Sequence, residues 1–241
     1  MYIRFFLIFL LVWLVYTGAR SAYFLHTSQG LFTASSQLPH QYSVGDLNNP
    51  VKKYLVLGDS TAAGTGASSL ETSYPYLIAQ AIAQKGYLVN VQVLAKSGAR
   101  LSDVLNDQLA ALPSHFDYLT VSVGANDATH FTNYSDYSNQ LSSLITDFKK
   151  HPEATILMAT PPDMSYTPAL PAPYRQIVGM RCAQELTLLQ QATSQTSVKI
   201  VDWYKDGALK SGQQPDLYAT DRFHPSSVGY AQWANLFINR L

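Results

Sequence analysis

With 241 residues the chain can form one well-buried domain together with a shorter appendage, and its 16 basic and 16 acidic side chains cancel. Because no local run of like charge departs from this balance, nucleic acid and other polyanions are excluded as partners. The only cysteine, Cys182, has no partner for a disulfide, and no group of Cys and His has zinc-site spacing. We therefore expect Cys182 to be a small buried side chain, and we expect no metal and no cofactor.

Residues 1–25 differ from the rest of the chain. An unbroken apolar and aromatic run, Phe5–Tyr16, is bounded by Arg4 and Arg20. This pattern predicts a membrane-targeting segment. The run is shorter than the roughly 20 residues that span hydrocarbon, but both arginines can snorkel and the apolar residues 22–25 can extend it.

This segment has two interpretations, an uncleaved membrane anchor or a cleaved signal peptide. Thr17-Gly18-Ala19 is a passable small-x-small cleavage site, which suits a signal peptide. We favour the anchor. Arg4 and the terminal amine outweigh Arg20, which places the N-terminus in the cytoplasm and the rest of the chain outside. Cleavage would instead give a secreted protein, so the rest of the chain crosses the membrane in either case.

Residues 26–50 are rich in Ser, Thr, Gln and Asn and contain Pro39 and Pro50, so they are expected to form a tether. From residue 51 to 241, short β-rich runs alternate with segments of helical periodicity. The expected strands are Lys53–Leu57, Leu88–Leu94, Phe116–Val123, Thr155–Thr160 and Val198–Asp202. The expected helices are Tyr74–Gln84, Leu101–Leu112, Tyr134–Phe148, Arg175–Gln191 and Ser227–Leu241.

Five such βα units predict an α/β fold with a five-stranded, mainly parallel sheet. Right-handed crossovers then give a three-layer α/β/α sandwich of the flavodoxin-like kind. In such folds the ligand site lies beyond the carboxyl ends of the strands.

Four short blocks follow or end these expected strands and loops. Their sequences, in chain order, are Gly58-Asp59-Ser60, Ser97-Gly98, Gly124-Ala125-Asn126-Asp127 and Asp221-Arg222-Phe223-His224-Pro225. Four pieces far apart in the chain can therefore meet at one edge of the sheet. Together they supply a nucleophile, an oxyanion hole and a base, and this makes hydrolysis the leading hypothesis.

Three of these residues suit nucleophilic catalysis. Ser60 needs a neighbouring base to take its proton, and His224 is the candidate. Asp221, three residues earlier, can accept the imidazole Nδ1 proton and fix the tautomer. The structural alternative is a turn at Gly-Asp-Ser and an aspartate that caps the last helix, with Pro225 at the helix entry.

Two further residues suit an oxyanion hole. Gly98 has no Cβ, so a substrate carbonyl can approach the backbone there, and the Asn126 side-chain amide can add a donor to the amides of Ser60 and Gly98. Ordinary turns are the alternative at both places. Asp127 is expected to be structural and to orient the loop.

Joined in this order, the four blocks resemble the SGNH hydrolases, also called the GDSL esterase and lipase family. The resemblance covers Lys53–Leu241. It implies that Ser60 is the nucleophile, that Gly98 and Asn126 line the oxyanion hole, and that the Asp-x-x-His block contributes the acid and the base.

The segment from Gly58 to Gly66 looks like the bacterial thioesterase I and lysophospholipase branch of that family. Thr61 replaces the leucine of the GDSL name. Arg100, two residues after Gly98, is bulkier and more charged than the resemblance implies, which leaves substrate preference open.

Three hypotheses follow. The first is a serine esterase that hydrolyses carboxylic ester or thioester bonds of lipids or small acyl esters through an acyl-enzyme. The second is a carbohydrate O-acetylesterase that acts on cell-surface polysaccharide, and the third is a non-catalytic binding module. The loops Ala128–Tyr134 and Pro161–Tyr174 carry aromatic side chains and are expected to shape the pocket. We make no prediction of oligomeric state.

Overall fold

The structure, a computed structural model, describes residues 2–32, 38, 40–207 and 215–241. Its centre is a six-stranded sheet in the order β1-β3-β2-β4-β5-β6. Strands β2 to β6 are parallel wherever they pair, and β1 is antiparallel to β3. The strands are β1 (Gln41–Val44), β2 (Val51–Gly58), β3 (Leu88–Val93), β4 (Tyr118–Ser122), β5 (Thr155–Ala159) and β6 (Lys199–Val201).

The sheet has one strand more than expected, and the five expected strands are all present. The extra strand, β1, lies inside residues 26–50, which we expected to be a tether throughout. It pairs Tyr42 with Val91 and Val44 with Val89 at the edge of the sheet. An edge strand of four residues with one face in solvent needs few apolar side chains, so its sequence looks like a linker. Residues 33–37 and 39 of the expected tether lie outside the described residues.

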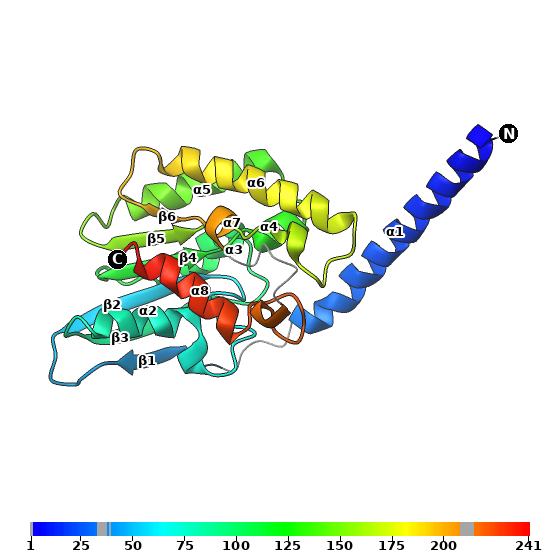
Figure 1. Cartoon of the computed structure of the whole chain (residues 1–241). Coiled ribbons are helices and arrows are strands. Elements are labelled where there is room, and N and C mark those ends of the chain that lie inside the picture. Colours follow the sequence, from blue (N-terminus) through cyan, green and yellow to red (C-terminus); the bar gives the residue numbers. More distant parts are fainter. Residues whose placement is uncertain (1, 33–37, 39, 208–214) are drawn as a thin grey trace.

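Helices cover both faces of the sheet, as the three-layer prediction requires. In Figure 1, α5 and α6 lie over one face and α2 and α8 over the other. The helices are α1 (Tyr2–Phe32), α2 (Tyr74–Ala83), α3 (Leu101–Asp103), α4 (Ala125–Thr129), α5 (Tyr134–Phe148), α6 (Tyr174–Thr193), α7 (Trp203–Asp206) and α8 (Ser227–Ile238).

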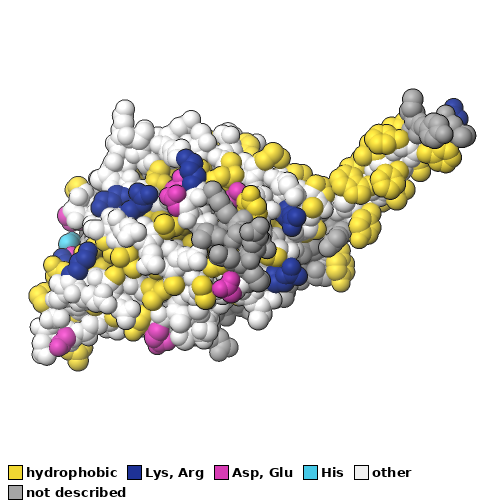
Figure 2. Space-filling model, in the orientation of Figure 1, with side chains coloured by type: hydrophobic (Ala, Val, Ile, Leu, Met, Phe, Trp, Pro, Cys, Tyr) yellow, Lys and Arg dark blue, Asp and Glu magenta, His cyan; other side chains and the backbone are white. Residues whose placement is uncertain are grey.

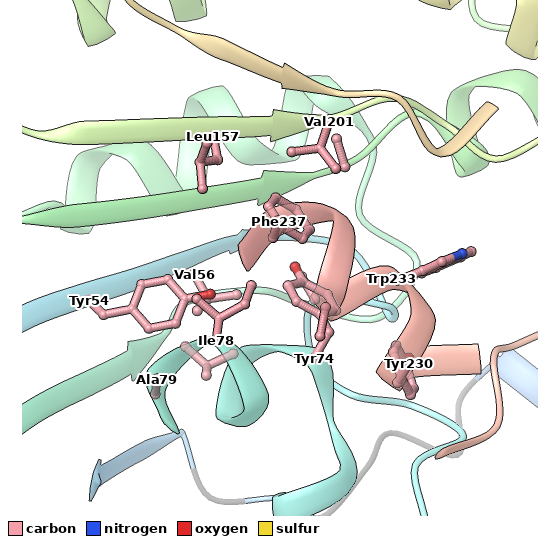
Figure 3. Close-up of a cluster of buried hydrophobic side chains, with 14 of the residues drawn as sticks. Tyr54, Val56, Tyr74, Ile78, Ala79, Leu157, Val201, Tyr230, Trp233 and Phe237 are labelled. Carbon is pink, nitrogen blue, oxygen red and sulfur yellow. The ribbon is translucent and has the colours of Figure 1, made fainter. Parts of the chain in front are cut away.

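The pleat of the strands divides the core between the two faces. Along β2, Tyr54 and Val56 join the apolar cluster beneath α2 and α8, which Figure 3 shows. Leu55 and Leu57 point to the other face and pack with residues of α5 and α6. Because both faces are buried, the parallel strands appear in the sequence as nearly continuous apolar runs.

The segment expected as one helix over Leu101–Leu112 is helical but irregular. It begins as α3, widens into a π-type turn at Val104–Gln108 and tightens into a 3₁₀ turn at Leu109–Ala111. Gln108 lies in the wide turn and is buried. Its side-chain amide bonds both the N–H and the carbonyl of Gly58, each at 2.8 Å, and so ties this segment to the end of β2.

The apolar run near the N-terminus forms part of α1. Its side chains from Phe5 to Tyr16 are exposed, and Figure 2 shows them along a helix that extends away from the rest of the molecule. Within the described residues, no helix combines the length and the apolar character needed to cross a membrane.

Candidate functional site

The candidate residues meet at the carboxyl ends of the central strands. Ser60 follows β2, and Asn126 lies in α4, just after β4. The chain places β3 on one side of β2 and then β4 on the other, so the loops after these strands diverge and leave an open edge between them. His224 reaches the same edge from the loop before α8. The structure therefore brings together blocks that are up to 164 residues apart.

Ser60, His224 and Asp221 form one hydrogen-bonded chain. The Nε2 atom of His224 lies 2.8 Å from Oγ of Ser60, and its Nδ1 atom lies 2.6 Å from Oδ2 of Asp221. A carboxylate can only accept, so Nδ1 carries the proton and Nε2 faces the serine as an acceptor. His224 and Ser60 are 1% and 7% exposed, and hence water competes little for these bonds.

The second carboxylate oxygen of Asp221 is also occupied. It accepts hydrogen bonds from the amides of Phe223 at 2.9 Å and His224 at 3.0 Å. Burial by itself would raise the pKa of Asp221, but these bonds and the one from the imidazole outweigh burial and hold the pKa below its ordinary value. Asp221 is therefore ionised at neutral pH.

The candidate oxyanion donors stand on loops that are hydrogen-bonded to the segment around Ser60. The N–H of Lys96 donates to the carbonyl of Gly58 at 3.1 Å, and the hydroxyls of Ser97 and Thr65 lie 3.4 Å apart. Among the described residues, neither the backbone N–H of Ser60 nor that of Gly98 donates a hydrogen bond within the protein. Gly98 has φ +80°, and a Cβ there would meet no atom within 4 Å, so the space beside its amide is open. The Asn126 side chain donates one N–H to the carbonyl of Ala99 at 3.0 Å, which leaves its other N–H for a ligand.

Asp127 is structural, as its place in the block suggested. It is buried and accepts hydrogen bonds from the N–H of Leu101 and the hydroxyl of Thr132, each at 2.9 Å. Burial raises its pKa above the ordinary value, against the effect of these bonds. Asp127 thus joins the start of α3 to the segment after α4 and orients the turn that carries Asn126.

Sequence reasoning did not identify Asp59 as a buried acid that holds the turn after β2 through Thr61. This carboxyl is 2% exposed and accepts hydrogen bonds from the N–H and the hydroxyl of Thr61, at 2.9 and 2.7 Å. Burial raises its pKa to about 6, although the bonds from Thr61 oppose the rise. The sequence does contain a signal for this role. An acid directly after a buried strand is itself buried, and it therefore needs hydrogen-bond donors from neighbouring residues.

Arg100 contributes its backbone, not its side chain, to the local structure. Its N–H donates to Oδ2 of Asp103 at 2.8 Å, which caps α3. The residue is exposed. It follows Ala99, whose carbonyl accepts the hydrogen bond from Asn126, and its positive charge lowers the pKa of Asp127 against the effect of burial.

The two aromatic loops divide between core and surface. Met164 and Tyr174 pack with Cys182 in a small apolar cluster, which confirms that the cysteine is buried. Phe131 and Tyr134 are exposed and lie 5.2 and 4.4 Å from the guanidinium of an arginine in α6. Of the aromatic side chains in these loops, Tyr174 therefore has a packing role, whereas Phe131, Tyr134 and Tyr166 are exposed.

A hollow of about 820 Å³ adjoins Asp221. Its walls are the segments 65–68, 218–221 and 226–228 together with Asp216. Five of the lining residues are serines or threonines, but most of the lining surface is apolar, so the hollow offers both polar and apolar contacts beside Asp221.

Comparisons with known proteins agree with one another. A model of the GDSL-like lipase/acylhydrolase family matches residues 56–232. A GDSL-like esterase of Mycobacterium tuberculosis is 29% identical over 189 residues, which cover 76% of this chain and 59% of that protein. The chain thus spans well under two thirds of this relative's length.

Solved structures share the fold. The lipase/acylhydrolase from Enterococcus faecalis has a TM-score of 0.59 at 23% identity, over 78% of this chain and 94% of that chain. The acetylxylan esterase Axe2 from Geobacillus stearothermophilus has a TM-score of 0.56 at 21% identity, over 78% and 93% of the two chains.

Proposed function

The chain belongs to the GDSL-like lipase/acylhydrolase family, and from this premise we propose that it is a serine ester hydrolase that works through an acyl-enzyme on Ser60. The observation that carries the proposal is the 2.8 Å contact between Oγ of Ser60 and Nε2 of His224, with Asp221 on the far side of the ring. A serine hydroxyl becomes a nucleophile only when such a base takes its proton.

The proposed reaction has two halves. His224 takes the proton of Ser60 as Oγ attacks the ester carbonyl, and Asp221 stabilises the resulting imidazolium. The amides of Ser60 and Gly98 and the side chain of Asn126 donate to the carbonyl oxygen as it becomes negative. His224 then returns the proton to the leaving alcohol or thiol. Water, activated by the same imidazole, attacks the acyl-enzyme and releases the acid and Ser60.

Replacement of the nucleophile tests this mechanism. Ser60→Ala is expected to lower kcat by about 10⁴- to 10⁶-fold on a short-chain nitrophenyl ester, because the covalent route is lost. Ser142→Ala changes an exposed serine of α5 and serves as the matched control. Near-normal turnover by purified, folded Ser60→Ala would overturn the assignment.

We propose lipid or small acyl esters as the substrate class, on the resemblance to the lysophospholipase-like branch. Carbohydrate O-acetylesterase activity is the second candidate, and the observation that favours it is the set of hydroxyls beside Asp221, including Ser68, Thr220 and Ser227. Release of fatty acid from lysophospholipid, compared with release of acetate from acetylated glycan, separates the two. A folded protein that hydrolyses no ester would favour a non-catalytic binding module.

We also propose that residues 1–25 carry the folded domain, whose sheet begins with β1, out of the cytoplasm. The exposed apolar run Phe5–Tyr16 between two arginines supports this proposal. Fractionation with N-terminal sequencing tests it. The full-length chain in the membrane fraction indicates an anchor, and an exported chain that begins near residue 20 indicates a cleaved signal peptide. A full-length chain in the cytoplasm contradicts both.

A further inference from the structure

Behind the proposed oxyanion donors, one acid is buried without a hydrogen bond. Glu185, in α6, is 1% exposed, and neither of its carboxyl oxygens has a partner among the described residues. The hydroxyl of Tyr137, in α5, is likewise buried and unpartnered. An ionised carboxylate is strongly disfavoured in such a place, so a buried acid of this kind calls for a physical reason.

Both polar atoms converge on the turn that carries Asn126. Gly124 begins this turn with φ +123°, just before α4. A Cβ on Gly124 would lie 2.9 Å from the Tyr137 hydroxyl oxygen and 3.0 Å from Oε2 of Glu185. The carboxyl of Glu185 is therefore packed directly against the backbone two residues before the proposed oxyanion donor.

The charged and titratable groups around Glu185 come from three helices. They are Asp127 in α4, Tyr137 in α5, and Arg181 and Cys182 in α6. Burial raises the pKa of Glu185 well above its ordinary value, Asp127 raises it further, and Arg181 opposes the rise. Glu185 makes no ion pair within the part of the chain that the structure describes.

Arg181 is engaged elsewhere. Its guanidinium donates to the carbonyl of Thr132 and stacks on the rings of Phe131 and Tyr134, on the segment that follows α4. Arg181 thus holds the loop beyond the turn. Its Nε is buried without a hydrogen-bond partner, yet it forms no ion pair with the carboxyl beneath the turn among the described residues. An uncharged acid is the form that fits this site.

We propose that Glu185 is a positioning residue whose protonated, neutral carboxyl supports the Gly124 turn and keeps negative charge away from the oxyanion that Asn126 is proposed to bind. This inference rests on the proposed function. Ionised Glu185 would repel the charge that develops in the tetrahedral intermediate, and a smaller side chain would let the turn shift. Both changes act on the transition state more than on substrate binding.

Two variants of the full chain test the role in catalysis. Glu185→Gln keeps the size and neutrality of the carboxyl and is expected to retain kcat within about 3-fold, whereas Glu185→Ala is expected to lower kcat by about 10- to 100-fold with little change in KM. Tyr137→Phe, which removes the neighbouring hydroxyl and leaves the carboxyl, is the matched control. Wild-type kcat in Glu185→Ala, or a loss in Glu185→Gln as large as in Glu185→Ala, overturns the proposal.

A spectroscopic measurement tests the charge state of Glu185 independently of turnover. It does not require Glu185→Ala, so it remains valid if that variant fails to fold. The infrared spectrum at pH 8 is expected to show a protonated carboxyl band that Glu185→Gln lacks and Tyr137→Phe keeps. Absence of that difference overturns the inference.

Labelling of Ser60 by a fluorophosphonate in the same samples keeps the two proposals apart. An unlabelled wild-type protein counts against the proposed function, whereas labelled protein with unchanged kcat in Glu185→Ala counts against the role of Glu185 alone.

Discussion

The carboxyl beside His224 and the carboxyl beneath Gly124 have opposite surroundings. Asp221 accepts hydrogen bonds from the imidazole and from two backbone amides, and its pKa is lowered. Glu185 has no such donor among the described residues, and burial raises its pKa. Donors alone do not decide the charge, because Asp59 and Asp127 each accept two hydrogen bonds and burial still raises their pKa. The pKa of Asp221 is lowered because it combines three donors with only partial burial.

Within this comparison, the largest expected loss of kcat comes from removal of the charged carboxylate, that of Asp221. Asp221→Asn is expected to lower kcat by about 10⁴-fold, because an amide beside Nδ1 no longer fixes the tautomer that leaves Nε2 free to accept the serine proton. Asp136→Asn, an exposed change on α5, is the control. Steady-state kinetics on a nitrophenyl ester measure both, and a loss below about 10-fold for Asp221→Asn would contradict its proposed role.

A smaller loss of kcat is expected from removal of the proposed oxyanion donor Asn126, which stands on the turn that Glu185 is proposed to support. Asn126→Ala is expected to lower kcat by about 10²- to 10³-fold with KM nearly unchanged, since its free N–H is proposed to act only on the developing oxyanion. Asn139→Ala on the surface of α5 gives the baseline. If the loss appears in KM instead, Asn126 contacts the ground-state substrate and the proposed role is wrong.

Gly124→Ala tests how tightly the turn is packed. The added Cβ would lie 2.6 Å from Cγ of Pro161 as well as against Tyr137 and Glu185. We expect the free energy of unfolding to fall by about 1–3 kcal/mol, with a lower kcat. Gly86→Ala is the matched control, because Gly86 also has positive φ (+89°) but has open space for a Cβ. Equal destabilisation in the two variants would show that backbone strain, not packing, dominates.

The last expected effect concerns the pH dependence of stability and leaves the proposed catalytic residues unchanged. Asp59 has a pKa of about 6 in the folded protein, against an ordinary 3.8. Its contribution to stability is therefore full below pH 4 and is lost as the pH rises through 6, a loss on the order of 3 kcal/mol. Asp221, with a lowered pKa, acts in the opposite sense and loses its contribution as the pH falls.

Denaturant unfolding of wild type and Asp59→Asn at pH 4, 5, 6 and 7 measures this effect. The variant is expected to show a weaker decline in stability over this range. Parallel curves for the two proteins would show that Asp59 is ionised in the folded state.

Sequence reasoning located the fold and the proposed catalytic residues for a clear physical reason. The strands of a parallel sheet are buried on both faces and appear as apolar runs, and the chemistry-bearing blocks follow those runs directly. Ser60 and His224 could therefore be placed at one sheet edge, although 164 residues separate them. The edge strand at Gln41–Val44 was missed because it has only four residues, two of them polar, within a segment rich in Ser, Gln and Asn.

Glu185 could not be found from the sequence. It lies on α6 among residues with the polarity of a solvated helix, and its burial depends on the packing of α4, α5 and α6 around the turn. No local pattern carries that information. The same holds for Gln108, whose bonds to Gly58 depend on the widened turn of a segment that looked like a regular helix.

The most direct test of the central claim is to treat the folded protein with a fluorophosphonate and map the adduct by mass spectrometry. We predict a single adduct on the peptide that contains Ser60, absent in Ser60→Ala and strongly reduced in Asp221→Asn. An adduct on another residue, or a protein that hydrolyses esters while Ser60 stays unlabelled, would contradict the account.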